Sequence, residues 1–287
     1  MAWKVVAKGE TETTACLPGS SQRILIGSHS GAVHLEISEV TIEPQAEIAG
    51  HRHPFEESFY VLAGGGVVTI GPTSYAVAAD DFGLVPLGQA HAWTNPNDQP
   101  LELLRVRSPQ PRHMRGEDPT YPTDDVTPHR DGIEPPRAVA APHRPVGRFD
   151  SSQLPPPGPL NMKGYRGPRI GGVSIWMLVD ELVGAIHHTM FIVEFESGGD
   201  RRPAGDHFHP FEEAYYFLAG SAIAHLEGED IPVSAGDIVF CGVNDLHGYS
   251  VTSEEPMRWI EVQSPAPPPN GATFFPDDWQ SDADGHA

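Results

Sequence analysis

Cysteine is scarce in this chain of 287 residues, which contains only Cys16 and Cys241. Disulfide frameworks and thiolate zinc clusters both need several cysteines at short, regular spacings. Two cysteines so far apart in the sequence form neither. Any metal site in this protein must therefore use nitrogen and oxygen ligands.

Positive charge and long apolar runs are also scarce. The 18 Lys and Arg residues stand against 39 Asp and Glu, a formal charge of −21 that repels nucleic-acid phosphates and anionic membrane surfaces. No apolar run is long enough for a spanning helix, and the first residues lack the apolar region of a secretory signal. We therefore expect a cytoplasmic protein with neither nucleic acid nor membrane as a partner.

The chain contains a long internal repeat. The segment His51-Arg52-His53-Pro54-Phe55-Glu56-Glu57 recurs as His207-Phe208-His209-Pro210-Phe211-Glu212-Glu213, and this offset of 156 residues holds to Ser108-Pro109 and Ser264-Pro265. Upstream, Gly31-Ala32-Val33-His34 matches Gly184-Ala185-Ile186-His187 at an offset of 153. A repeat of this length predicts two domains of one fold.

Proline marks the boundary between the two copies. Residues 109–159 hold 13 of the 30 prolines and show almost no apolar periodicity. Proline stops helices and cannot donate to a strand ladder, so this segment is either extended or draped over a domain surface. The sequence predicts an N-terminal barrel over 1–109, a proline-rich connector over 110–160, a C-terminal barrel over 161–269 and an acidic tail over 270–287.

Each copy is built of short β-branched or aromatic runs separated by Gly, Pro, Asp and Asn. This pattern is typical of an antiparallel sandwich or barrel, and no long amphipathic helix is visible. We therefore expect an all-β fold. The expected strands cover residues 33–42, 58–62, 66–70, 75–78 and 101–106 in the first copy and residues 190–195, 214–218, 222–226 and 257–262 in the second.

The repeated histidines and glutamate have the pattern of a metal site. Side chains two residues apart on a strand share a face, so each His-x-His pair can act as a pincer. A turn after the following proline brings back the glutamate, and a distal histidine approaches from a third strand. Three imidazoles and one carboxylate suit Fe(II), Mn(II), Zn(II), Ni(II) or Cu(II). The candidate ligands are His51, His53, Glu57 and His91 in the first copy and His207, His209, Glu213 and His247 in the second.

These motifs resemble those of the cupin superfamily in its two-barrel, bicupin form. The spacing from His51 to Gly64, and from His207 to Gly220, fits the first cupin motif, and the second motif is matched by Pro86, Gly88, His91 and Asn95. In the second copy Gly242-Val243-Asn244 replaces Pro-x-Gly, and Val251 replaces the Asn. The resemblance implies two tandem antiparallel jelly-roll barrels, each holding one divalent transition metal, with Fe(II) expected first.

Other residues are candidates for the walls of a substrate pocket. Phe59 and Trp93, with their equivalents Tyr215 and Tyr249, either line the pocket or fill the barrel core. Arg105 and Arg107 either clamp a substrate carboxylate or lie at the surface, and Glu261 and Gln263 take their places in the second copy.

Neighbouring residues have simpler interpretations. Glu56 and Glu212 alternate to the face opposite the ligand glutamates, so we expect them at solvent or at an interface. His34 and His187 are expected in the core or on the surface. Cys241 is expected to be a small buried residue rather than a nucleophile.

The function predicted from the resemblance and the ligand type is an oxidoreductase of dioxygenase type acting on a small organic substrate. The alternatives are a redox-silent isomerase, decarboxylase or hydrolase, and a non-catalytic protein that binds metal and small molecules. No catalytic residue beyond the ligands is identified by the sequence. Association into a homodimer or larger homo-oligomer is expected to cover sheet edges.

Overall fold

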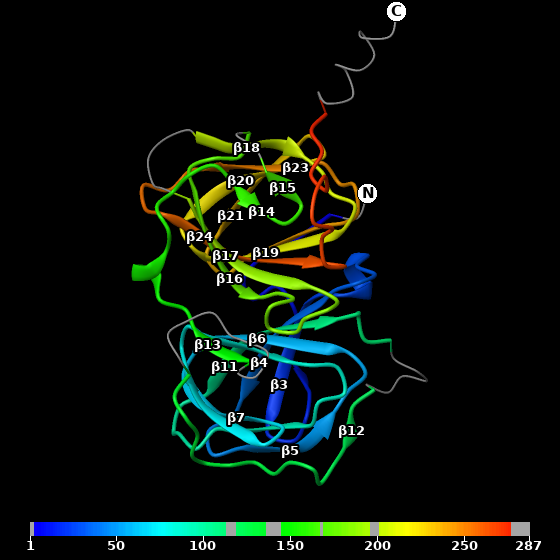
Figure 1. Ribbon diagram of the computed structural model, residues 1–287, viewed down its shortest axis with the longest axis vertical. Coiled ribbons are helices and arrows are strands. Elements are labelled where there is room, and N and C mark those ends of the chain that lie inside the picture. The colour runs from blue at the N-terminus through cyan, green and yellow to red at the C-terminus, as the bar shows by residue number, and fades with distance from the viewer. Residues whose placement is uncertain (1–2, 113–118, 136–144, 167–168, 196–200, 277–287) are drawn as a thin grey trace, which may run out of the picture. The chain divides into compact units, whose positions relative to one another are not determined.

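The protein is almost entirely β-structure. The computed structural model describes residues 3–112, 119–135, 145–166, 169–195 and 201–276, and it divides the chain into two compact units (Figure 1). We call the unit of residues 11–152 and 177–189 the first barrel, and the unit of residues 1–10, 153–176 and 190–287 the second barrel. The described residues contain no helix with the length and apolar composition that a membrane crossing would require. The all-β, two-barrel expectation is confirmed.

The first barrel consists of two antiparallel sheets. One has the strand order β13-β9-β6-β11-β4-β3-β2, and the other β12-β5-β10-β7-β8. Short 3₁₀ turns cover Ser28–Ser30 and Ser151–Gln153. The strands are β2 (Thr14–Ala15), β3 (Ser20–Ile26), β4 (Glu36–Ile42), β5 (Glu47–Arg52), β6 (Glu56–Ala63), β7 (Gly65–Ile70), β8 (Thr73–Ala78), β9 (Asp81–Val85), β10 (His91–Thr94), β11 (Leu101–Ser108), β12 (Tyr121–Pro122) and β13 (Val146–Arg148).

The second barrel repeats this plan. Its larger sheets have the orders β1-β22-β19-β24-β17-β16 and β18-β23-β20-β21, and β14 and β15 form a small hairpin. The strands are β1 (Lys4–Val6), β14 (Asn161–Met162), β15 (Tyr165–Arg166), β16 (Val173–Val179), β17 (Thr189–Phe195), β18 (Arg201–His207), β19 (Glu212–Ala219), β20 (Ser221–Leu226), β21 (Glu229–Ser234), β22 (Ile238–Cys241), β23 (His247–Val251) and β24 (Met257–Ser264).

A glycine turn connects one sheet to the other at the same point in both barrels. Gly64 joins β6 to β7 with a φ of 76°, and Gly220 joins β19 to β20 with a φ of 75°. A Cβ atom at Gly64 would lie 2.1 Å from the carbonyl oxygen of Pro100. The left-handed conformation and the close approach both require glycine, which explains why the repeat keeps Leu-Ala-Gly at this point.

The proline-rich connector contributes strands to the first barrel. Its β12 pairs with β5, placing Pro122 opposite His51, and β13 pairs with β9. The connector comes so close to β5 that a Cβ atom at Gly50 would lie 2.2 Å from the carbonyl oxygen of Val126. Of the two paths predicted from the sequence, the described part of the connector follows the draped one.

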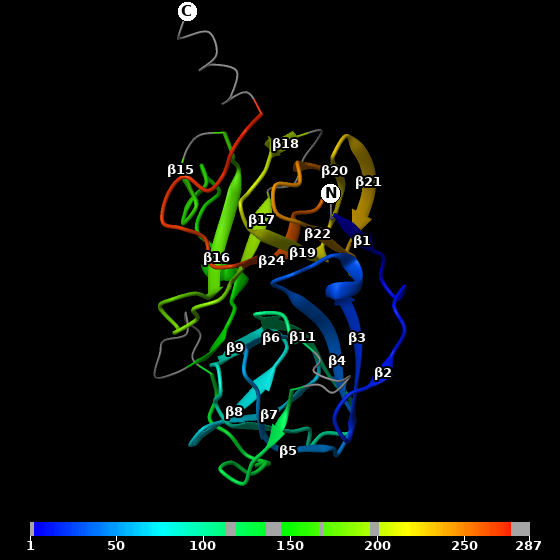
Figure 2. The same cartoon turned by 90° about the vertical axis from the view of Figure 1, so that its right-hand side faces the viewer.

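Each barrel contains one short segment from the other copy of the repeat or from its flank. Strand β1 pairs with β22 in the second barrel, as Figure 2 shows, and Val6 is buried there. Residues 177–189, which we call the arm, belong instead to the first barrel. Neither the strand at Lys4–Val6 nor the arm was expected from the repeat.

The arm is anchored by a buried polar cluster centred on Glu56. Its carboxylate accepts hydrogen bonds from the amides of Ile186 (2.7 Å) and His187 (3.0 Å) and lies 3.2 Å from Nδ1 of His188. Nε2 of His188 lies 2.7 Å from the hydroxyl of Ser58. Burial would raise the pKa of Glu56, but the hydrogen bond to His188 and the two amides outweigh burial and lower the pKa.

Of the two places expected for Glu56, at solvent or at an interface, solvent is therefore wrong. Glu56 and Glu212 are 1% and 2% exposed. The alternation of β6 does turn Glu56 away from the face of Glu57, but the arm covers that opposite face.

Replacing Glu56 by Ala is expected to destabilise the protein by about 3 kcal/mol, because His188 and two amides lose their buried partner. Urea unfolding followed by fluorescence measures this. Glu102→Ala, an exposed glutamate on β11, is the control and should change the free energy of unfolding by less than about 0.5 kcal/mol. Equal stability of the two variants would contradict the role of the cluster.

Candidate metal centres

The four predicted ligands of the first barrel converge at one point. His51 on β5 is the register partner of His91 on β10, and their ring centroids lie 4.1 Å apart. The metal-binding nitrogens of His51, His53 and His91 lie within 4.8 Å of one another. Glu57 on β6 reaches the same point, with Oε2 3.5 Å from Nε2 of His53 and Oε1 3.9 Å from Nε2 of His91.

Backbone carbonyls orient the imidazoles of this first centre. Nδ1 of His51 donates to Ala49 (2.9 Å), that of His53 to Phe55 (3.0 Å) and that of His91 to Gln89 (3.2 Å). A carbonyl only accepts, so the proton is on Nδ1 and the lone pair on Nε2. Within the described part of the chain, the buried Nε2 atoms of His53 and His91 have no hydrogen-bond partner.

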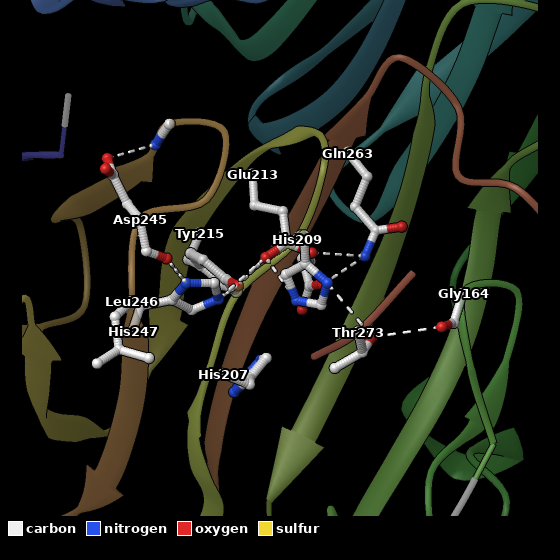
Figure 3. A network of polar contacts seen from close by, with 12 residues as sticks. Gly164, His207, His209, Glu213, Tyr215, Asp245, Leu246, His247, Gln263 and Thr273 are labelled. Carbon is white, nitrogen blue, oxygen red and sulfur yellow. Dashed lines mark hydrogen bonds and ion pairs between the residues drawn. The ribbon is translucent and has the colours of Figure 1, made fainter. Parts of the chain in front are cut away.

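The second barrel has the same arrangement, shown in Figure 3. The metal-binding nitrogens of His207, His209 and His247 again lie within 4.8 Å of one another. Oε2 of Glu213 lies 3.3 Å from Nε2 of His209 and 3.1 Å from Nε2 of His247.

Carbonyls orient these histidines as well. Nδ1 of His207 donates to Gly205 (2.8 Å), that of His247 to Asp245 (2.9 Å) and that of His209 to Ala272 (2.9 Å). Nε2 of His247 lies 2.9 Å from the Tyr215 hydroxyl. Both donor sets, of three imidazoles and one carboxylate, suit a divalent metal.

Burial sets the charge state of the ligands. Desolvation lowers the pKa of His51 and lowers that of His91 to about 3. Burial would raise the pKa of Glu213, but nearby His209 and His247 lower it to about 2. His51 and His91 are therefore neutral, which is the protonation state that a bound cation needs. Burial would lower the pKa of His247, but the neighbouring Cys241 and Glu213 raise it well above its ordinary value, so this ligand must lose a proton when a metal binds.

The cavity of the first centre contains two arginines. It has a volume of about 590 Å³ and is lined by His51, His53 and Glu57 together with Arg105 and Arg107. The expectation that strand-end arginines lie at the surface is wrong here, because Arg105 and Arg107 are 8% and 2% exposed. Cavity residues that the sequence analysis missed include Cys16 and Gln22.

The two arginines have different partners. Arg107 donates from Nε to Glu36 (2.9 Å) and lies over the ring of Phe55, so its charge is paired. Arg105 donates from Nε to the hydroxyl of Ser38 (3.2 Å), and this nitrogen lies 3.8 Å from Oε2 of Glu57.

The aromatic candidates for the pocket wall have different surroundings in the two barrels. In the first barrel Phe59 and Trp93 pack edge to face, with centroids 4.9 Å apart, inside the apolar core. The Phe59 ring lies against Gly83, where a Cβ atom would be 2.6 Å from its Cζ. The register partner of Tyr215 is Val239. Tyr215 instead lines the cavity, donating to Oε2 of Glu213 (2.5 Å).

The cavity of the second centre is smaller, at about 50 Å³, and its chemistry differs. Glu261 takes the place of Arg105 and accepts hydrogen bonds from the indole of Trp259 (3.1 Å) and the amide of Gln263 (3.0 Å). Burial and the nearby Glu213 raise the pKa of Glu261 well above its ordinary value, so this carboxyl is neutral. Gln263 also donates to Glu213 (2.8 Å).

Both barrels match a known protein family. The cupin domain family matches residues 38–107 and 191–263. The oxalate-binding protein of Thermotoga maritima is 27% identical over 113 residues, which is 39% of this chain and 88% of that protein. The chain belongs to the cupin superfamily, and its two barrels with two histidine clusters make it a bicupin.

Solved oxalate decarboxylases share this fold. The Lactobacillus farciminis enzyme, in a formate complex, superposes with a TM-score of 0.64 at 18% identity over 97% of this chain and 90% of its own. The Bacillus subtilis enzyme, described with Mn(II) centres, superposes with a TM-score of 0.62 at 17% identity over 98% of this chain and 83% of its own.

Each barrel is expected to hold its metal independently. After loading with Mn(II) and desalting, the protein should retain about two equivalents, and the double variants His51→Ala/His53→Ala and His207→Ala/His209→Ala about one each. Elemental analysis measures this. The exposed pair His29→Ala/His129→Ala is the control and should keep both metals. Loss of both metals from either double variant would contradict independent sites.

The metal-free protein should lose stability as the pH falls below about 6.5, because unfolded histidines take up protons that buried His91, with a pKa of about 3, does not. Each such histidine contributes a slope of up to about 1.4 kcal/mol per pH unit within this window. Urea unfolding between pH 4 and 7 measures it. We expect His91→Gln to flatten the dependence of the unfolding free energy on pH and exposed His129→Gln to leave it unchanged. Equal slopes in the two variants would disprove the role of buried His91.

Proposed function

We propose that this bicupin is a metal-dependent enzyme that recognises a small carboxylate, oxalate or a compound of its size, at the first centre. The observation that carries the proposal is the buried guanidinium of Arg105 in the wall of the metal-site cavity. The names of the oxalate-binding relative and of the oxalate decarboxylases support it.

Arg105 has donors to spare for a substrate. Its Nε donates to Ser38, its Nη2 donates to Gln22, and its Nη1 contacts the Cys16 thiol. They use three of the five N–H groups that a guanidinium carries, which leaves about two for a carboxylate. Charge-assisted, two-point contacts of this kind are the strong ones and fix the orientation of a planar anion.

The first centre would hold its divalent metal through His51, His53, Glu57 and His91. When bound, that metal supplies a Lewis acid for substrate oxygens. Arg107 is neutralised by Glu36, and a bound metal would offset the charge of Glu57, so Arg105 is the guanidinium of this cavity that an anionic substrate would pair with. Mn(II) is the metal we propose to load first, with Fe(II), predicted from the sequence, as the comparison.

The reaction that we propose is decarboxylation. Cleavage of the carbon–carbon bond of hydrogen oxalate releases carbon dioxide and leaves formate, which receives the proton on carbon. This reaction involves no net oxidation. It therefore belongs to the redox-silent class of enzymes, which the sequence predicts as an alternative to a dioxygenase. It is supported by the two-barrel oxalate decarboxylases that share the fold.

Arg105→Ala is expected to weaken oxalate binding to the Mn(II)-loaded protein by about 10- to 100-fold, because a charged hydrogen-bond donor is lost. Isothermal titration calorimetry measures the affinity. Arg130→Ala removes an exposed arginine of the same barrel and should bind like the parent protein. Unchanged affinity in Arg105→Ala would refute carboxylate recognition by this residue.

The same proteins, supplied with ¹³C-labelled oxalate, separate the three function classes. Labelled formate and carbon dioxide without oxygen consumption support decarboxylation. Consumption of one oxygen molecule per oxalate, with two molecules of carbon dioxide and one of hydrogen peroxide as products, supports an oxidoreductase instead. Tight oxalate binding with no product leaves a binding protein and rules out both enzymes.

A further inference from the structure

The hydroxyl of Tyr249 is buried in the second barrel without a partner. Tyr249 lies on β23, is 1% exposed and lines the cavity of the second centre. Its ring packs against those of Tyr215 and Trp259, with centroids 4.9 and 5.0 Å away. Within the described residues its hydroxyl makes no hydrogen bond. A buried polar group left unpaired costs about 1–3 kcal/mol, so a polar group here that lines a cavity indicates a ligand.

The walls of this cavity favour a ligand with an apolar body. Ile170, Ile175, Phe191, Val193 and Phe195 all line it. A volume of about 50 Å³ holds roughly four water-sized groups. The ligand is therefore of only a few non-hydrogen atoms.

The polar side chains around Tyr249 differ from those of the first cavity. The positions of Arg105 and Arg107 in the first barrel are taken here by Glu261 and Gln263, and Glu213 adds a carboxylate. Half-buried Lys163 also lines the cavity. A carboxylate that approached Tyr249 would therefore lack the buried guanidinium groups that line the first cavity and would meet the carboxyl group of Glu261 instead.

We propose that the second barrel binds a small uncharged ligand with a hydroxyl or carbonyl oxygen on an apolar body, and that the Tyr249 hydroxyl hydrogen-bonds this oxygen. The two barrels of one chain then select ligands of different charge. The inference is independent of carboxylate recognition in the first barrel and shares with it only the metal.

The test uses two probes with one carbon skeleton, uncharged hydroxyacetone and anionic pyruvate. The protein is the His51→Ala/His53→Ala variant loaded with Mn(II), so that only the second centre is paramagnetic. Broadening of the methyl proton signal in a titration reports each probe near that centre. We expect hydroxyacetone to bind about ten-fold more tightly than pyruvate, and Tyr249→Phe in this background to weaken it about ten-fold.

Tyr121→Phe, which alters an exposed tyrosine, is the matched control and should leave the titration unchanged. Tighter binding of pyruvate, no broadening by either probe at full Mn(II) content, or equal affinity in Tyr249→Phe would each overturn the proposal. The comparison of probes needs no Tyr249 variant, so it decides even if Tyr249→Phe folds poorly. Oxalate binding is measured separately in His207→Ala/His209→Ala, and its failure would affect the first barrel alone.

Discussion

The hydrogen bond from imidazole Nδ1 to a backbone carbonyl is the interaction on which both centres depend. It fixes the tautomer, turns Nε2 inward and leaves buried nitrogen lone pairs facing a carboxylate. In four of the six histidines the carbonyl belongs to the residue two positions earlier, as in His51 with Ala49 and His247 with Asp245. The strand that supplies the ligand therefore also orients it.

This local character explains what could be predicted from the sequence. The metal-ligand sets, the all-β class and the two-barrel architecture follow from short-range spacing and from the repeat. The clusters at His51 and His207 show both the spacing and the repeat. Long-range partners could not be predicted in this way. The burial of Arg107 depends on Glu36, 71 residues away, and that of Glu56 on His188, 132 residues away. His209 is oriented by Ala272, from a segment that the sequence predicted only as an acidic tail.

Residues at equivalent positions of the two repeats also have different surroundings, which the sequence spacing alone does not determine. Phe59 and Tyr215 occupy the same place in the repeat, yet one ring fills the core and the other lines a cavity. The residues opposite these rings also differ, because Gly83 pairs with Phe59 and Val239 pairs with Tyr215. The charged groups differ as well, because Glu261 and Gln263 take the places of Arg105 and Arg107.

The exchanged segments have a consequence for how the chain folds during synthesis. Val6 is made 232 positions before its partner Ile238. The first barrel likewise waits for the arm, whose His187 and His188 contact Glu56. Pairings so distant in sequence are slow to form and leave strand edges open while the ribosome works. Neither half of the chain encodes a complete barrel, so each barrel is completed only when residues from both copies of the repeat have been made.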